Sequence, residues 1–336
     1  MNKRVPVMAL IVASACALVM FLPAASPVSA GPTSYRFAVG GDDHYGDTAG
    51  SGANMWGNTS IAYMSALQRN GIQRFFEVGD LTKEQGPRAY SELAEIYNNS
   101  GIPYNITLGN HDFGYLSFGC QPILDYYSGP YALVVDSIVF ILMEATTMTA
   151  FNESTISWLD STLTAHQDEI CFIMMHIMHK TLGYPEVEVN DASFINLVES
   201  HADHIGAVIA GHIHEYKTPN MYDVNGVHYT YSGTVGSDYA PMNPDGIFSY
   251  LTVEMEETVK GWNLHLYRKN INTDAIIAGT EDYYAVEWGD HAVEEHPASS
   301  AALEFSSING VSCLMAATMA VMTALRQVRR WTSPPC

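Results

Sequence analysis

Short apolar runs alternate with amphipathic stretches along most of the chain. Apolar runs rich in β-branched and aromatic residues predict strands at residues 35–39, 74–78, 104–108, 170–175 and 205–210. Apolar positions at helical spacing predict helices over about 59–70 and 88–98, one starting at a Ser154 cap and one starting at an Asp191 cap. Strands that alternate with helices favour parallel pairing, so this part of the chain predicts an α/β fold.

The pattern changes twice in the rest of the chain. Residues 131–135 and 137–143 are two apolar runs split by Asp136, which predicts a hairpin. After residue 210, short alternating runs follow one another without helices, and they predict antiparallel strands at 227–231, 247–254 and 262–267. Residues 273–307 are rich in acidic and small residues with little periodicity, and we interpret them as an acidic linker.

Residues able to bind metal or to move protons follow five of the predicted strands directly. In an open α/β sheet, ligands bind beyond the carboxyl ends of the strands, so these side chains are expected to gather at one edge. One such residue after a strand would mean little, but five occurrences in one domain are hard to assign to chance. The residues are Asp42 and His44, Asp80, Asn110 with His111 and Asp112, His176, and His212 with His214.

These motifs resemble the calcineurin-like metallophosphoesterase family. The resemblance rests on Asp42-x-His44, Gly79-Asp80, Gly109-Asn110-His111-Asp112, His176 and Gly211-His212-x-His214, and it covers about residues 35–270. It implies a metallophosphoesterase-like sandwich of two mixed β-sheets flanked by helices. It also implies hydrolysis of phosphate esters at a dinuclear metal centre.

The resemblance further implies which residues bind each metal ion. The first ion would be held by Asp42, His44 and His214, the second by Asn110, His176 and His212, and Asp80 would bridge the two. Carboxylates together with imidazoles suit Mn, Fe or Zn. Two such ions, about 3.5–4 Å apart, neutralise phosphate oxygens and lower the pKa of a bridging water, which supplies the attacking hydroxide.

By the same resemblance, His111 would protonate the leaving oxygen or stabilise the transition state, and Asp112 would orient its ring. Two alternatives stay open. Asp43 competes with Asp42 as a ligand, although the Asp-x-His spacing favours Asp42 because alternate residues near a strand end point the same way. His179 competes with His176; we favour His176, which directly follows its strand, and His179 is then free to reach the substrate.

At two positions the motifs differ from those of the purple acid phosphatases, a subclass of the family. Purple acid phosphatases have Asp-x-Gly in the first motif and a Tyr three residues after the second Asp. Here those places hold His44 and Lys83, so a Tyr-ligated iron centre is not expected. The loops at 45–56 and 113–128, rich in Gly and Tyr, are expected to choose the substrate.

Charge excludes one class of partner. The chain of 336 residues has 15 Lys and Arg against 36 Asp and Glu, a net charge of −21. Nucleic-acid binding needs clustered basic side chains, so neither DNA nor RNA is an expected partner, and a nuclease is disfavoured. The expected partner is a small-molecule phosphate ester.

Both ends of the chain carry apolar segments. Residues 1–30 have a basic start, an apolar stretch and small residues at the end, which predicts a signal peptide; a retained membrane anchor is the alternative. Residues 308–325 are apolar and uncharged, which predicts a transmembrane segment followed by a basic cytoplasmic tail at 326–336, although an amphipathic helix packed on the domain is the alternative. The catalytic domain, residues 31–272, is then expected outside the cell or in the periplasm, anchored by the C-terminal segment.

The cysteines add little. Cys120 and Cys171 could form one disulfide in an oxidising compartment, but their spacing gives no support for it, and no cysteine has the spacing of a zinc site. The sequence therefore predicts an exported metal-dependent hydrolase of phosphomonoesters or small phosphodiesters. The alternative is a catalytically silent phosphate- or nucleotide-binding or sensing protein of the same fold. Its mark would be the loss of His111 or of a bridging ligand, and the sequence keeps both.

Overall fold

The computed structural model describes the central part of the chain. The described residues are 34–46, 54, 57–83, 86–112, 129–185, 187–214, 221–237 and 246–287. All of them belong to the first of two compact units, Met1–Gly289; the second is Asp290–Cys336. The predicted signal peptide, transmembrane segment, basic tail and Cys120 lie outside the described residues, as does most of the two substrate loops. Within the described residues, no helix has the length and apolar character needed to cross a membrane.

The first sheet combines a parallel half with an antiparallel half. Its order is β12-β11-β10-β1-β2-β3, and β1, β2 and β3 run parallel because a helix crosses between each pair. The later strands add antiparallel neighbours on the other side of β1. The elements are β1 (Ser34–Gly40), α2 (Asn58–Arg69), β2 (Arg74–Val78), α3 (Gly86–Ser100), β3 (Tyr104–Thr107), β10 (Ser249–Thr258), β11 (Gly261–Asn270) and β12 (Asp282–Glu287).

The second sheet has the order β4-β5-β6-β7-β9-β8, with parallel pairing from β5 through β9 and an antiparallel strand at each edge. Every residue of β6 and β7 is buried, as expected for parallel strands covered on both faces. The elements are β4 (Tyr131–Val135), β5 (Ile138–Leu142), α5 (Glu153–Ala165), β6 (Ile170–Met175), α6 (Ala192–Ser200), the short 3-10 helix η2 (Ala202–His204), β7 (Ile205–Ala210), β8 (Met221–Val224) and β9 (Val227–Tyr231).

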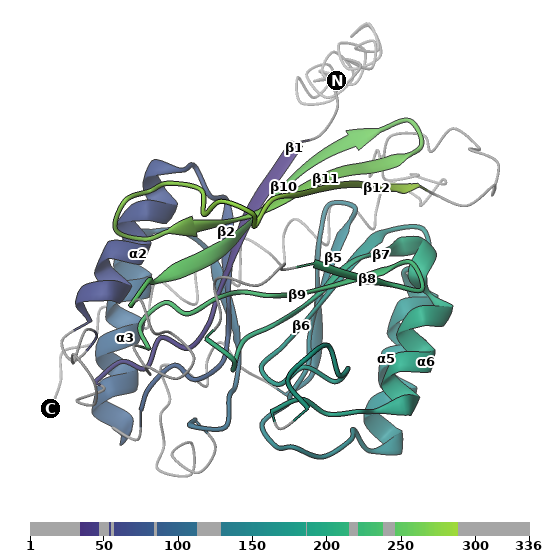
Figure 1. Cartoon of the computed structure of the whole chain (residues 1–336), viewed down its shortest axis with the longest axis horizontal. Helices are drawn as coiled ribbons and strands as arrows, with labels where there is room; N and C mark the ends of the chain where they lie inside the picture. The colour runs from purple at the N-terminus through teal and green to yellow at the C-terminus, as the bar shows by residue number, and fades with distance from the viewer. Residues whose placement is uncertain are drawn as a thin grey trace, which may run out of the picture. The chain divides into compact units, whose positions relative to one another are not determined.

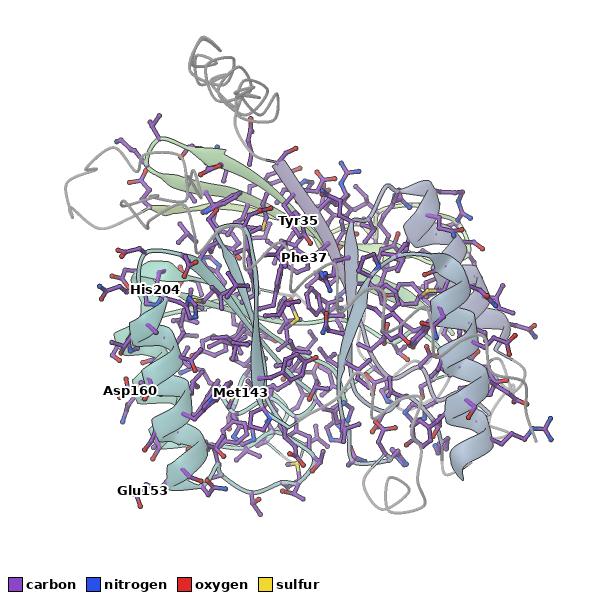
Figure 2. The ribbon with its side chains drawn as sticks, turned by 180° about the vertical axis from the view of Figure 1, so that it is seen from behind. Tyr35, Phe37, Met143, Glu153, Asp160 and His204 are labelled. Atoms are coloured by element: carbon purple, nitrogen blue, oxygen red, sulfur yellow. The ribbon has the colours of Figure 1, made fainter. Side chains whose placement is uncertain are left out.

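The elements stack in four layers, with α2 and α3 outside the first sheet and α5 and α6 outside the second (Figure 1). Three apolar clusters fill the spaces between layers: one under each helix pair and one between the sheets. Phe37 of β1 lies in the space between the sheets, where its ring meets Phe140 and Phe172 of the other sheet at 5.0 Å each (Figure 2). The predicted sandwich of two mixed sheets flanked by helices is therefore confirmed.

Several details differ from the sequence analysis. The strand at 227–231, expected to be antiparallel, pairs parallel with β7 and antiparallel only with β8. The cap of α5 is Asn152, not Ser154; its side chain accepts a hydrogen bond from the Thr155 backbone N–H. The expected linker from residue 273 starts too early, because β12 pairs with β11 and belongs to the first sheet. The sequence analysis also missed β8, whose hairpin with β9 turns at Asn225-Gly226, both with positive φ. That dipeptide is the usual signal for a two-residue hairpin turn.

Candidate metal centre

The backbone is unusual where the metal-capable residues follow the strands. Among the described residues, eight non-glycine residues have a positive φ, and five of them are Asp42, His44, Asp80, His212 and His214. A left-handed backbone costs free energy for residues with a Cβ, and such strain persists where the surrounding structure holds it. The strain is therefore concentrated in the residues that the motifs singled out.

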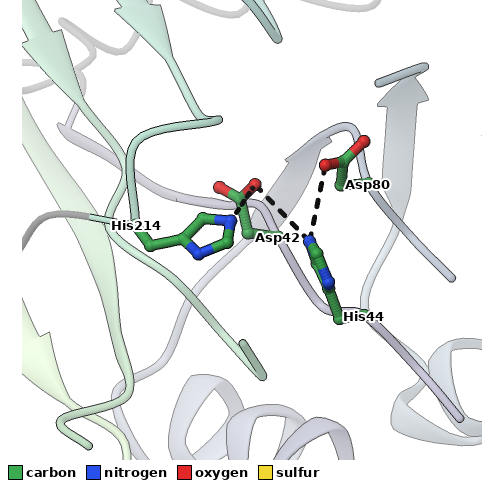
Figure 3. Close-up of side chains that lie close together, drawn as sticks. All are labelled: Asp42, His44, Asp80 and His214. Carbon is green, nitrogen blue, oxygen red and sulfur yellow. Dashed lines mark ion pairs between the residues drawn. The ribbon is translucent and has the colours of Figure 1, made fainter. Parts of the chain in front are cut away.

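A first donor group gathers four of these residues. Asp42, His44, Asp80 and His214 each offer one ligand atom, and these atoms lie within 4.8 Å of one another. All four side chains are buried (Figure 3). The Asp42 carboxylate has one oxygen with no hydrogen-bond partner, 3.1 Å from His214 Nε2 and 4.0 Å from His44 Nε2. A buried carboxylate oxygen left to face two imidazoles fits a cation between them.

A second donor group shares Asp80 with the first. It consists of Asp80, His176 and His212. His176 Nδ1 meets the Val78 carbonyl at 2.8 Å, which leaves Nε2 directed at the site. There Nε2 lies 3.3 Å from Asp80 Oδ1, 3.0 Å from Asn110 Oδ1 and 3.2 Å from His212 Nδ1. Two ring nitrogens and two oxygens thus converge on one point, which fits a metal ion better than mutual hydrogen bonding.

The charges of the protein without metal agree with this arrangement. Burial raises the pKa of Asp80, but the neighbouring His176 and His44 rings outweigh burial and hold that pKa well below its usual range. Burial lowers the pKa of His176, but the charges of Asp80 and Asp42 outweigh it and raise that pKa to about 9. The pKa of His212 falls to about 4 because of burial and the charge of His176. The His176 imidazolium therefore offsets only part of the charge of the two carboxylates, and a metal ion bound there would release that proton.

Two glycines let the backbone come close enough to build the site. A Cβ at Gly109 would collide with the Asp80 carboxylate, and a Cβ at Gly236 would collide with the Asp43 carbonyl oxygen. Gly236 belongs to the loop 232–237 after β9, whose backbone N–H groups bond to the Gly41 and Asp42 carbonyls. Sequence reasoning missed this loop. Its signal was the run Ser-Gly-Thr-Val-Gly-Ser directly after a predicted strand.

The proposed pair of catalytic residues is only partly assembled. His111 lies at the site, with Nε2 3.9 Å from Asp80 Oδ2 and its ring 5.1 Å from the ring of His44. Asp112 does not orient that ring. Its buried carboxylate accepts hydrogen bonds from the backbone N–H groups of Gly109, Leu81 and Thr82 and from the Tyr90 hydroxyl. Asp112 thus ties the loop after β3 to the loop after β2, because those donors surround it.

The geometry distinguishes the alternatives that the sequence left open, Asp43 against Asp42 and His179 against His176. Asp43 belongs to neither donor group and accepts hydrogen bonds from Asn54, Ser60 and Tyr97. His179 pairs with Asp191 at 3.1 Å and belongs to neither donor group. Asp42 and His176 are the members that the structure brings together with the other donors. That these residues bind metal stays a prediction.

Cys171 is a free, buried cysteine. Burial and the charge of Glu169 raise its pKa to about 12, so it stays a neutral thiol. Its expected partner, Cys120, lies outside the described residues.

No protein-family model matches the chain, and no curated protein matches it. Among solved structures, the purple acid phosphatase PPD1 from yellow lupin seeds is similar over 78% of this chain, with 17% sequence identity and a TM-score of 0.56. This chain covers 55% of the length of the lupin protein. TT1561 of Thermus thermophilus (10% identity, TM-score 0.48) covers 76% of this chain and 100% of its own length, and Vps29 of Cryptosporidium parvum (12% identity, TM-score 0.41) covers 75% and 98%.

The scores of the last two structures are too low to carry an argument. At 17% identity the lupin enzyme shows the fold alone. Its likeness agrees with the two mixed sheets and the outer helices. This chain has the fold of the calcineurin-like metallophosphoesterases.

Proposed function

We propose that this chain is a metal-dependent hydrolase of phosphate esters with a dinuclear centre. The observation that carries the proposal is the sharing of Asp80 between two donor groups, each built from residues at strand ends. A single metal ion would need only one such group. Two groups joined by a carboxylate are what a pair of metal ions requires.

The residues fit the proposed metals. Imidazole and carboxylate donors suit Mn, Fe or Zn, and the Asp42 oxygen that faces His214 and His44 is a buried group that a cation would satisfy. When bound, such ions would neutralise the phosphate oxygens and make hydroxide available near neutral pH. We assign Asp42, His44 and His214 to one ion, Asn110, His176 and His212 to the other, and Asp80 to both.

The chain's own groups would do the rest of the chemistry. Hydrolysis forms a bond from hydroxide oxygen to phosphorus and breaks the ester P–O bond, and the leaving oxygen then needs a proton. His111 is partly exposed and beside Asp80, so it is placed to give that proton or to stabilise the charge on the phosphate. The backbone N–H of His111 donates to Asp80 Oδ1 at 2.8 Å, which fixes the bridging carboxylate.

The test is turnover by the full chain after its metals are stripped and Mn is restored. A chromogenic phosphomonoester and the matching diester are compared, and the ratio of their rates distinguishes phosphatase from phosphodiesterase. Manganese-dependent hydrolysis of either supports the proposal. Binding of two metal ions without turnover, with Mn, Fe and Zn alike, contradicts it and favours the silent binding or sensing protein.

We also propose that the domain works outside the cell or in the periplasm, tethered by the apolar segment at 308–325. The support is the pattern of the sequence at both ends. Separation of cells into membrane, soluble and external fractions tests this, and activity confined to the cytoplasmic fraction would contradict it.

A further inference from the structure

A cavity of about 250 Å³ lies at the carboxyl ends of β5 and β6. We name it the β5–α5 pocket, because most of its lining comes from the segment between those two elements. Glu144, Thr147, Thr149, Phe151 and Thr155 line it, together with His179 from the segment after β6. Figure 2 labels Met143 and Glu153, which mark the two ends of the segment that forms the main wall. The volume suits a group of a few heavy atoms, smaller than a drug-sized ligand.

The backbone that forms the wall of this pocket pairs with the backbone around His176, a residue of the candidate metal centre. Met143 N donates to the Met174 carbonyl and Ile177 N donates to the Ala145 carbonyl, so the wall runs along the backbone on both sides of His176. Thr107, at the end of β3, donates its hydroxyl to the Met143 carbonyl at 2.6 Å. The strand end that leads to Asn110 and the strand end that leads to His176 therefore both bond to Met143, directly before the lining residue Glu144.

His179 is held in one orientation at the pocket. It is 1% exposed and stacks on Phe151, with ring centroids 3.7 Å apart. Its Nδ1 faces Asp191 Oδ2 at 3.1 Å, and Asp191 in turn accepts the backbone N–H groups of Phe151, Ser193 and Phe194. Nδ1 therefore carries the proton, because its partner is a carboxylate already fixed by backbone donors. This leaves the lone pair on Nε2, which is buried and has no partner among the described residues.

The lining defines the chemistry of a ligand. Burial lowers the pKa of His179, partly offset by Asp191, so the ring is neutral and Nε2 accepts a hydrogen bond. The one charged residue among the described residues that line the pocket is the acid Glu144, and no lysine or arginine joins it. The Glu144 carboxylate and the lone pair of His179 Nε2 would repel an anionic group. The same two groups would accept hydrogen bonds from a hydroxyl or ammonium group.

We propose that the β5–α5 pocket holds the alcohol half of the phosphate ester and that His179 Nε2 accepts a hydrogen bond from a hydroxyl or amino group of that alcohol. This inference rests on the proposed function, since the ester phosphate must lie at the neighbouring donor groups. It names the substrate class: small aliphatic esters whose leaving group carries hydrogen-bond donors. His179 is a specificity-determining residue, separate from the metal donors.

The first experiment compares glycerol 3-phosphate with propyl phosphate on the full chain loaded with Mn. The two leaving groups share a three-carbon skeleton and differ in two hydroxyls. His179→Asn keeps a nitrogen donor near Nδ1 for Asp191 and removes the Nε2 acceptor. We expect kcat/KM for the glycerol ester to fall about 3- to 10-fold, the value of one neutral hydrogen bond, with propyl phosphate changed less than about twofold. His179→Gln, which places an oxygen near Nε2, should restore part of the preference.

The second variant distinguishes the two kinds of donor. Glu144→Gln leaves the buried ring untouched and removes the one charge of the pocket lining, so it remains informative even where a His179 variant fails to fold. It should lower kcat/KM for ethanolamine phosphate several-fold and leave the glycerol ester nearly unchanged if an ammonium group lies beside Glu144. An equal effect on both esters would contradict a specific contact between Glu144 and the ammonium group.

Three outcomes overturn the inference. The wild-type chain could hydrolyse a chromogenic monoester without any preference for esters whose leaving group carries hydrogen-bond donors. That result would refute the role of the β5–α5 pocket and leave the proposed function intact. A His179→Asn variant that slows glycerol and propyl esters equally assigns His179 a structural role. If the chain binds Mn and hydrolyses no ester at all, the proposed function is refuted, and so is this inference.

Discussion

Two histidines three residues apart after β6 have opposite electrostatic surroundings. His176 faces Asp80 in a donor group, and the charges of Asp80 and Asp42 raise its pKa to about 9. His179 faces Asp191, and burial lowers its pKa. Both rings are buried and each has a carboxylate within 3.3 Å. Burial and a single carboxylate therefore do not decide the protonation of a histidine.

The difference lies in what else surrounds each carboxylate. Asp191 accepts three backbone N–H groups, so much of its charge is already satisfied and little is left to hold a proton on His179. Asp80 accepts one backbone N–H and faces His44, His111 and His176, with a second buried acid, Asp42, nearby. The first surroundings make a neutral acceptor, and the second make a set of donors with excess negative charge that suits metal ions.

The largest effect is expected from Asp80→Asn, which removes the carboxylate that both donor groups share. Turnover should fall by about 10²–10³-fold or more, as for the loss of a single preorganised electrostatic group. Metal content, measured by elemental analysis, should fall from two ions per chain to one or none. The same change at the exposed Asp160 serves as the control (Figure 2). Unchanged turnover in Asp80→Asn would refute the shared carboxylate.

A smaller loss of turnover is expected from His176→Asn. This variant, compared with His179→Asn, tests directly whether the two histidines have different roles. The second ion should be lost and the first retained, with activity reduced by roughly 100-fold or more, because the loss of a group that only orients a metal ligand already costs about 10- to 100-fold. His179→Asn should keep both ions, so metal content measured on the two variants side by side is the decisive comparison. Equal metal loss in both would show that the two histidines act as one unit.

A third prediction concerns stability. Asp112→Asn replaces a buried carboxylate oxygen by an amide nitrogen that faces N–H and O–H donors. We expect a loss of about 1–3 kcal/mol in the free energy of unfolding, measured in denaturant. Asp136→Asn, in an exposed turn with positive φ, should change it little. Intact stability in Asp112→Asn, with a loss of activity alone, would contradict the role of Asp112 in tying the two loops together.

The smallest effect is expected from Asp191→Asn. The amide can still cap α6, so the cost at pH 7 should be about 1 kcal/mol. Burial raises the pKa of Asp191, but hydrogen bonds from Phe151, His179 and Phe194 outweigh it and lower the pKa in the folded chain. The ionised group therefore adds stability that is present above its unfolded pKa of about 3.9.

That contribution is lost as the pH falls through the folded pKa of Asp191. The difference between wild type and variant should be largest near neutrality, and in urea titrations it should shrink as the pH falls below about 3.9 and through the folded pKa. A difference that is constant with pH would mean that the loss comes from geometry and not from charge.

Much of the fold was predictable from short patterns. Residues 74–78, 170–175 and 205–210 are strands in the structure with the predicted bounds, because parallel strands buried on both faces leave continuous apolar runs. β12 was missed because Val286 is its one buried residue and Tyr283, Ala285 and Glu287 are exposed, so the run looks like a linker without the neighbouring strand. Its Tyr284 hydroxyl reaches the Gly206 carbonyl in the other sheet, a contact between distant parts of the chain.

Local sequence was enough to specify the chemistry available at the strand ends, since a residue that directly follows a buried strand must lie at the edge of the sheet. That reasoning places Asp42, Asp80 and His176 together. The neighbours of Asp112 and His179, which follow the same strand ends, were set by the packing of the whole domain. Their partners come from other segments: the backbone after β2 in one case and the cap of α6 in the other. The local sequence determines at which strand end a side chain lies. The hydrogen-bond partners supplied by the tertiary structure determine whether that side chain is charged, orients a neighbouring side chain or holds the backbone.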